Sequence, residues 1–201
     1  MNDVDILKKI EKKVLWLACW MIHNANHIRE NQDGLKVGGH QASSASIVSI
    51  MTALYFNILR PEDRVAVKPH ASPVFHAIQY LSGLQTKEKI ENFRGFGGAQ
   101  SYPSRTKDID DVDISTGSVG LGVAMTSFIS LIQDYIARKK FYNNRQLGRM
   151  IALVGDAELD EGNVYECLQE GWKHDLRNVW WIIDYNRQSL DGVAVSYTHL
   201  R

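Results

Sequence analysis

Two oxygen-bearing side chains each follow a separate apolar run of the sequence. Asp156 comes directly after "IALVG", and Asn186 lies thirty residues further on, after "WWIIDY". A carboxylate and a side-chain amide oxygen are hard ligands of the kind that Mg²⁺ prefers, and Mg²⁺ completes its octahedron with water and phosphate oxygens. Glycine at position 155 would let the backbone come close to a phosphate group. The pair therefore predicts a magnesium diphosphate site.

The residues around this pair predict a strand-helix-strand unit. "RMIALV" at 149–154 and "VWWIID" at 179–184 predict two strands, and residues 163–173 between them predict a helix. Two strands joined in this way run parallel. Ligands of parallel sheets gather outside the carboxyl ends of the strands. We therefore expect Asp156 and Asn186 to approach each other at that edge, where the start of the helix would add free N–H groups for a phosphate.

The rest of the chain predicts the α/β class, with a parallel sheet and helices on both of its faces. Apolar residues recurring every three or four places indicate further helices, at residues 4–29, 44–59, 74–81 and 119–140, and a β-rich run occupies residues 64–67. Residues 94–118 are rich in Gly, Ser, Asp and Pro and have no period, which predicts a loop. A loop of that length inside a compact domain is often functional.

Composition excludes some classes of partner. The 201 residues suit one domain, and 23 basic against 23 acidic side chains give no electrostatic case for nucleic acid or an acidic membrane. The two cysteines, Cys19 and Cys167, form no CxxC pair, which fits reduced thiols. A signal peptide and a long uninterrupted apolar run are both missing from the sequence. We therefore expect a cytoplasmic protein that binds neither nucleic acid nor membrane.

Several stretches, taken in order, resemble a known family. They are "GGHQASSAS" at 38–46, "HASP" at 70–73, "AQSYPSR" at 99–105, "STGSVGLG" at 115–122 and "NRQSLDG" at 186–192. With Gly-Asp followed thirty residues later by Asn, the set is similar to the thiamin diphosphate fingerprint of transketolases and 2-oxo acid dehydrogenases. It most resembles the amino-terminal domain of the homodimeric type of pyruvate dehydrogenase decarboxylating component. The resemblance implies a transketolase-like N-terminal, diphosphate-binding domain at residues 1–193 and leaves an atypical tail at 194–201.

The resemblance also implies which residues bind the cofactor and its metal. Asp156 and Asn186 match the side-chain ligands of magnesium, and Gln188 matches the residue that lends its main-chain carbonyl. The residues that would line the diphosphate are Gly155, Ala157 and Glu158, together with the turn of Gly117, Ser118 and Val119. Ala157 stands where the family usually has glycine, and its methyl group is tolerable if the residue keeps a negative φ.

Other positions match residues on the substrate side of the cofactor. By the resemblance, His40 and His70 correspond to two histidines that face the thiazolium and the substrate. There they would relay protons and stabilise the oxygen of the intermediate. Ser43 and Tyr102 correspond to positions near the substrate.

The activity implied by the resemblance is decarboxylation of a 2-oxo acid such as pyruvate, with transfer of the acyl unit to a lipoyl-bearing acyltransferase. Such enzymes are homodimers and need a second, pyrimidine-binding domain or subunit. The family continues for hundreds of residues after position 193, so we expect a truncated gene product or a natural split subunit. Two alternatives stay open: part of a transketolase that transfers two-carbon ketol units, or a non-catalytic binding module that keeps the fold.

The remaining acidic and histidine residues are expected to have ordinary roles. Asp160 and Glu161 suit the first turn of a helix, and "DIDDVD" at 108–113 lacks the glycine and glutamate of a calcium loop, so we interpret it as a solvated loop. His23 and His27 have a spacing that could bind zinc, but no third ligand accompanies them. Packing or surface roles are expected for those two and for His76, His174 and His199.

Overall fold

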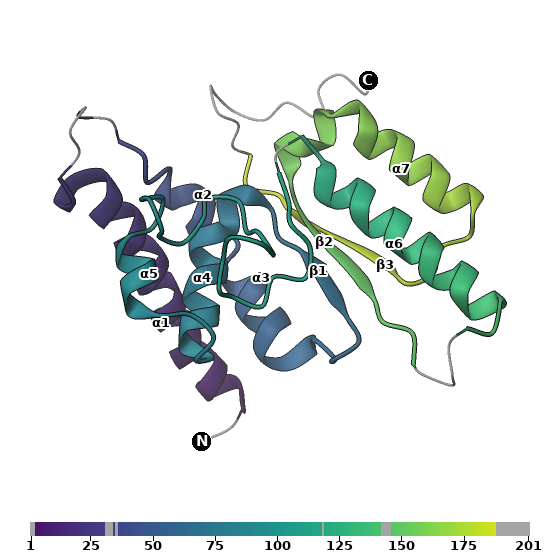
Figure 1. Ribbon diagram of the computed structural model, residues 1–201, viewed down its shortest axis with the longest axis horizontal. Helices are drawn as coiled ribbons and strands as arrows, with labels where there is room; N and C mark the ends of the chain where they lie inside the picture. Colours follow the sequence, from purple (N-terminus) through teal and green to yellow (C-terminus); the bar gives the residue numbers. More distant parts are fainter. Residues whose placement is uncertain (1–2, 31–33, 35, 118, 142–145, 188–201) are drawn as a thin grey trace. The chain divides into compact units, whose positions relative to one another are not determined.

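The computed structural model describes residues 3–30, 34, 36–117, 119–141 and 146–187 (Figure 1). The chain forms two compact units, of which the first contains Met1–Leu59 and Pro69–Val112 and the second contains Arg60–Lys68 and Asp113–Arg201. Each unit takes its sequence from two separate segments. Within the described residues, no helix is both long and apolar enough to cross a bilayer.

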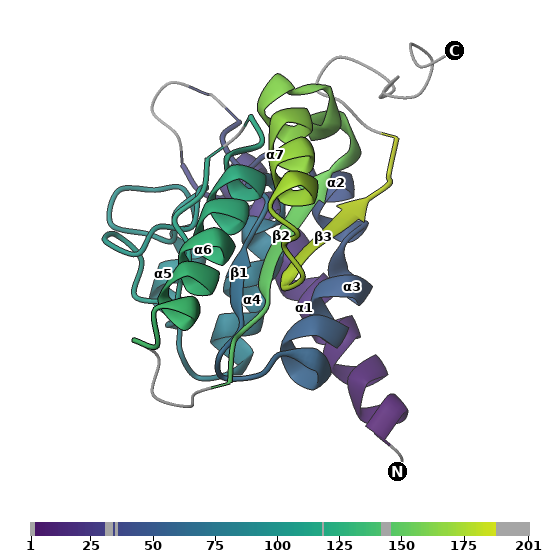
Figure 2. The ribbon, with the colours of Figure 1, turned by 90° about the vertical axis from the view of Figure 1, so that its right-hand side faces the viewer.

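The second unit is built on a three-stranded parallel sheet in the order β1-β2-β3. The strands are β1 (Arg64–Ala66), β2 (Met150–Gly155) and β3 (Val179–Asp184) (Figure 2). β2 pairs with both neighbours, and Gly155 lies opposite Asp184 in the β2–β3 register. The structure thereby confirms the α/β class with a parallel sheet, and β2 and β3 form the strand pair that the sequence predicts.

Two helices pack on this sheet. α6 (Leu121–Arg138) lies mainly against β2, α7 (Gly162–Lys173) lies beside α6, and the short 3₁₀ helix η4 (Asp156–Asp160) joins β2 to α7 (Figure 1). Their shared core consists of small or branched residues from β1, β2, α6, α7 and the loop before α6, namely Ala66, Ile114, Val123, Ala152, Val154, Val164 and Cys167. β2 is buried over its whole apolar run, as a central parallel strand must be. The sheet is therefore a rigid base for whatever follows its carboxyl ends.

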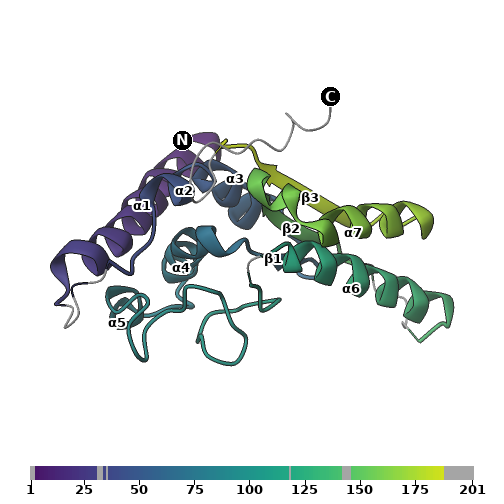
Figure 3. The same cartoon turned by 90° about the horizontal axis from the view of Figure 1, so that it is seen from above.

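The first unit is helical. Its helices are α1 (Asp3–His23), α2 (Gln41–Ala45), α3 (Val48–Ala53), α4 (Ser72–Leu81) and α5 (Lys87–Glu91), with π-helical turns η1 (Asn24–Ile28) and η2 (Leu54–Ile58) and the 3₁₀ turn η3 (Pro69–Ala71). α1 packs against α2, α3 and α4 (Figure 3). α4 is almost wholly buried and supplies Val74, Phe75 and Ile78 to the core.

One predicted helix is broken. The sequence predicts a single helix at 44–59, whereas the structure has α2, a turn at Ser46 and Ile47, then α3 and η2. The serines explain the break, because their hydroxyl groups compete with helical hydrogen bonding. Ser44 Oγ donates to the main-chain oxygen of His70 at 3.0 Å, and Ser46 Oγ lies 3.4 Å from the main-chain oxygen of Ser43. The predicted loop at 94–118 is correct for the residues described, which contain no helix or strand.

Candidate cofactor site

The carboxyl ends of the three strands carry three buried charged residues. Lys68 follows β1 by two residues, Asp156 follows β2 directly, and Asp184 is the last residue of β3. Their exposed fractions are 4%, 1% and 4%. Lys68 Nζ lies 2.5 Å from Asp184 Oδ2, so the first and third strands are linked by an ion pair at this edge. Charged residues are rarely buried unless they are paired or serve a ligand.

The chain after β3 comes close to Asp156. The main-chain N–H of Arg187 donates to Asp156 Oδ2 at 2.7 Å, and the N–H of Ala157 donates to Oδ1 at 3.1 Å. Asn186 Nδ2 donates to Asp184 Oδ2 at 3.1 Å. The segment that contains Asn186 therefore lies beside Asp156, as the strand order leads us to expect. The proposed third ligand, Gln188, lies outside the described residues.

The carboxylate of Glu158 faces the same corner. Its Oε2 accepts the main-chain N–H of Gly155 at 2.8 Å, and the backbone of Gly120 also donates to this carboxylate. Burial raises the pKa of Glu158, although these two hydrogen bonds and the nearby Lys68 act in the opposite direction. Glu158 thus joins the end of β2 to the loop that precedes α6.

That loop is held tightly over the end of β1. Thr116 Oγ1 donates to the main-chain oxygen of Val67 at 2.7 Å, and Asn163 Nδ2 donates to that of Val119 at 2.8 Å. Val119 has a φ of 67°, a left-handed conformation that a β-branched residue adopts only under strain. Such strain is commonly found at ligand sites. Of the predicted diphosphate turn, Gly117 and Val119 lie on this loop, and Ser118 is outside the described residues.

Glycine is required at position 120 and is dispensable at 157. Gly120 has a φ of 71°, and a Cβ atom there would lie 2.6 Å from Val164 Cγ2. Ala157, by contrast, lies in η4 and has no positive φ. The methyl group that distinguishes Ala157 from the usual glycine is therefore accommodated without backbone strain.

The charges of the corner suit a divalent cation. The carboxylates of Asp156, Glu158 and Asp184 stand against one ammonium, that of Lys68, and this leaves two unbalanced negative charges when all four groups are ionised. Carboxylate and amide oxygens are the donors that Mg²⁺ selects. The donor set thus fits magnesium with a diphosphate, on the side of the sheet where parallel folds bind ligands.

Comparison with known proteins shows the family of the chain. Residues 37–199 match the family described as "Transketolase, thiamine diphosphate binding domain". The chain belongs to this thiamine diphosphate-binding family.

Individual relatives are similar to most of the chain, at low sequence identity. The pyruvate dehydrogenase E1 component of Mycolicibacterium smegmatis is 27% identical over 202 residues, which is 95% of this chain and 21% of that protein. The pyruvate dehydrogenase E1 component of Escherichia coli is 25% identical over 200 residues, which is 95% of this chain and 22% of that protein. Transketolase-like protein 2 of Mus musculus is 30% identical over 167 residues, which is 78% of this chain and 25% of that protein. The chain thus spans between a fifth and a quarter of the length of these relatives.

The residues that the resemblance assigns to the substrate side belong to the first unit. His40 directly precedes α2, His70 lies in η3, and both side chains are exposed. The hydrogen bond from Ser44 to His70 joins their two segments. Ser43 is half-buried in α2, and Tyr102 is exposed on the loop after α5. The roles assigned to these four residues stay predictions.

The glycines before His40 are held by a residue that the sequence did not single out. Asn26 Oδ1 accepts the main-chain N–H of Gly38 at 2.7 Å, and Asn26 Nδ2 donates to the main-chain oxygen of Gly39 at 3.1 Å. A Cβ atom on Gly38 would lie 2.5 Å from the main-chain oxygen of Ile22, so the close approach requires glycine. Asn26 thereby positions the backbone that leads into His40.

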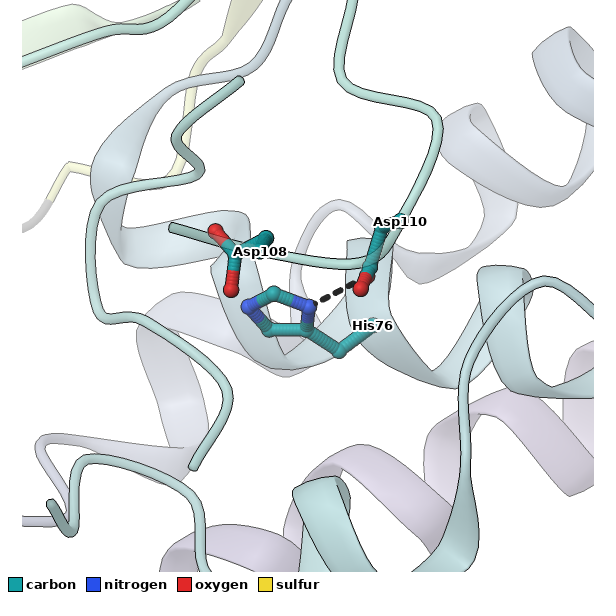
Figure 4. A group of neighbouring side chains, drawn as sticks. All are labelled: His76, Asp108 and Asp110. Atoms are coloured by element: carbon teal, nitrogen blue, oxygen red, sulfur yellow. Dashed lines mark hydrogen bonds and ion pairs between the residues drawn. The ribbon is translucent and has the colours of Figure 1, made fainter. Parts of the chain in front are cut away.

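The prediction that the loop at 108–113 is solvated is wrong for Asp108 and Asp110. Asp110 is buried and contacts His76, whose Nδ1 lies 2.6 Å from Asp110 Oδ2 (Figure 4). Gln85 Nε2 also donates to Asp110. Asp108 accepts the main-chain N–H groups of Gln100 at 2.9 Å and Ser104 at 2.8 Å. The aspartates turn inward because buried donors of the same unit need acceptors.

His76, Asp108 and Asp110 are also close enough together to suggest a metal site. Nε2 of His76 lies 2.8 Å from the main-chain oxygen of Gln100, which can only accept, so this nitrogen carries a proton. Nδ1 is occupied by Asp110. A histidine ligand needs a free lone pair, so we interpret the cluster as a hydrogen-bonded core of the first unit. This agrees with the packing role expected for His76.

Proposed function

We propose that this chain is the magnesium- and thiamin diphosphate-binding part of a pyruvate dehydrogenase-like enzyme. The single observation that carries the proposal is the buried charged corner at the ends of three parallel strands, in a chain of the thiamine diphosphate-binding family. The relatives named pyruvate dehydrogenase E1 component support decarboxylation of a 2-oxo acid and transfer of the acyl unit to a lipoyl-bearing acyltransferase. The cofactor supplies the electron sink when it is bound.

The second unit would hold the metal and the diphosphate. Asp156 and Asn186 would bind magnesium through side-chain oxygens, with Gln188 adding its main-chain carbonyl. Asp156 is buried, and main-chain N–H groups fix its carboxylate, so little conformational entropy is lost when a metal binds. Gly155 and the turn at Gly117 would bring backbone close to the phosphates.

The first unit would act on protons. His40 and His70 are exposed imidazoles on neighbouring segments, and an imidazole nitrogen can donate or accept a proton. In the proposed enzyme each ring would hold or deliver a proton at one of its ring nitrogens, beside the substrate oxygen. Ser43 and Tyr102 would contact the substrate.

The proposed enzyme needs more protein than this chain. We assign to it a second, pyrimidine-binding domain or subunit and a homodimeric assembly. α6 supports this, because it buries Thr126, Ser127 and Ser130 while five of its large side chains, Leu121, Met125, Phe128, Ile132 and Tyr135, are exposed. The exposed residues recur at intervals of four and three, the spacing by which two copies of one helix interlock.

A second candidate function is that of a transketolase fragment, which would transfer two-carbon ketol units. The similarity to the mouse transketolase-like protein favours it. Both candidates require thiamin diphosphate and magnesium at the same corner. Assays on the complete enzyme with pyruvate and with a ketose phosphate would distinguish them.

The test of the corner is isothermal titration calorimetry of the chain with thiamin diphosphate, with and without magnesium. We expect Asp156→Asn and Asp156→Ala to abolish the magnesium-dependent part of the affinity. Both substitutions remove the Asp156 carboxylate, which is the charged member of the proposed ligand set. The matched control, Asp160→Ala, removes an exposed carboxylate at the end of η4 and should leave the affinity within about twofold.

Two outcomes would contradict the proposal. One is a wild-type chain, folded by circular dichroism, that shows no magnesium-dependent binding at millimolar thiamin diphosphate even when a pyrimidine-binding domain is supplied. The other is an equal loss of affinity in the Asp156 and Asp160 variants, which would mean that the acidic cluster acts only through its overall charge.

A further inference from the structure

The family resemblance assigns no role to Lys68, the positively charged partner of Asp184 at the corner. Its side chain is 3% exposed and that of its partner Asp184 is 5% exposed. Burying an ion pair costs several kcal/mol of desolvation per ion, so such a pair contributes little to stability compared with two packed apolar side chains. A lysine ammonium is also a strongly hydrated point charge that is seldom buried. Stability alone is therefore a poor reason for this lysine.

The surroundings of Lys68 indicate a ligand. A Cβ atom built on Gly155 would lie 4.0 Å from Lys68 Nζ and 3.6 Å from Glu158 Oε2, so the ammonium borders the bend where a phosphate is expected. Lys68 also acts electrostatically on Glu158. The main-chain N–H groups of Gly155 and Gly120 already donate to the Glu158 carboxylate. A diphosphate at this bend would therefore need another donor.

We infer that Lys68 is a diphosphate-binding residue, held in place by Asp184 and able to donate an N–H group to a phosphate oxygen. The inference rests on the proposed function and makes it more specific, because it assigns the cofactor two separate sources of positive charge. Magnesium is one, and the ammonium at the end of β1 is the other. Lysine binds phosphate as a compact point charge and needs no particular orientation of its partner.

The experiment compares the thiamin diphosphate affinity of matched variants by calorimetry in the presence of magnesium. Lys68→Met keeps most of the side-chain volume and removes the charge, and we expect its affinity to fall by about 10- to 100-fold, the usual range for a lost charged hydrogen bond. Lys68→Arg keeps the charge and should bind within about fivefold of the wild type.

Lys68→Met leaves the Asp184 carboxylate buried without its cation, so it can unfold the second unit. The double variant Lys68→Met/Asp184→Asn removes both charges and keeps the fold testable by circular dichroism. The single variant Asp184→Asn keeps the ammonium. If Lys68 binds the phosphate, Asp184→Asn binds at least tenfold tighter than the double variant. If Lys68 only stabilises the fold, the two variants bind equally, which overturns the inference.

Failure of this inference and failure of the proposed function give different results. Wild-type affinity that depends on magnesium, together with equal affinity in the single and double variants, would refute only the role of Lys68. A wild-type chain that does not bind thiamin diphosphate would refute both.

Discussion

The carboxylate of Asp63 fastens the amino-terminal ends of β1 and β2. Its side chain is completely buried, and it accepts the main-chain N–H groups of Arg149 at 2.7 Å and of Arg60 at 2.9 Å. The guanidinium of Arg149 donates to it as well, with Nε at 3.0 Å. Burial raises the pKa of Asp63, but the hydrogen bonds from Arg149 and Arg60 outweigh this effect and lower the pKa to about 2.

The shift sets the size of a stability prediction. A fall in the pKa of Asp63 from its ordinary value of 3.8 to about 2 corresponds to roughly 2.5 kcal/mol of stabilisation by the ionised carboxylate. Because the pKa is lower in the folded protein, this stabilisation is present above about pH 4 and is lost as the pH falls toward 2. We therefore expect Asp63→Asn to lower the free energy of unfolding at pH 7 by about 2–3 kcal/mol.

Urea denaturation followed by circular dichroism between pH 7 and pH 2.5 measures this difference. The control is Glu62→Gln, one residue away and half-buried, which should change the free energy of unfolding by less than about 0.5 kcal/mol. The difference between wild type and Asp63→Asn should shrink as the pH falls. A difference that stays constant down to pH 2.5 would refute the electrostatic explanation and leave packing as the cause.

Two further predictions concern backbone and core. Gly120→Ala should lower the free energy of unfolding by about 2–4 kcal/mol, because alanine would meet both the left-handed backbone and Val164; thermal melts should show no such loss for Gly162→Ala, whose added Cβ meets nothing within 4 Å. His76→Ala should cost about 3–5 kcal/mol, because it leaves a cavity and removes one of the hydrogen-bond partners of the buried Asp110. Added zinc should leave the melting temperature of the wild type unchanged, and a rise of several degrees would restore the metal interpretation of this cluster.

The sheet and the approach of Asp156 to the segment that contains Asn186 could be predicted from the sequence because both depend on local patterns. β2 and β3 are continuous apolar runs, and the polar residues that end them must emerge at one edge once the strands are parallel. Asp156 and the segment containing Asn186 accordingly meet through the N–H of Arg187. Spacing alone was enough for this step.

Other parts of the site depend on partners that are distant in sequence. Sequence spacing does not connect Lys68 with its partner Asp184, which is 116 residues away. Asp110 looked solvated for the same reason, because His76 lies 34 residues and Gln85 25 residues before it. The sequence contains one indication of the role of Lys68, because this residue, like Asp156, follows a run of buried residues at the end of a strand. The broken helix at 44–59 depends likewise on the contact of Ser44 with His70.

The charge balance of the corner explains why a lysine is useful where the metal site already has a cation. Asp156, Glu158 and Asp184 exceed Lys68 by two negative charges, and magnesium would cancel that excess. A diphosphate then adds about three more negative charges in a buried place, where repulsion is screened poorly. Two local features reduce this cost. Lys68 can turn part of its interaction from Asp184 to the phosphate, and Glu158, whose pKa is raised by burial, gives up its negative charge more readily than an exposed glutamate. In the proposed site the corner would thus be acidic enough to hold the metal and would still be able to accept the diphosphate that the metal brings.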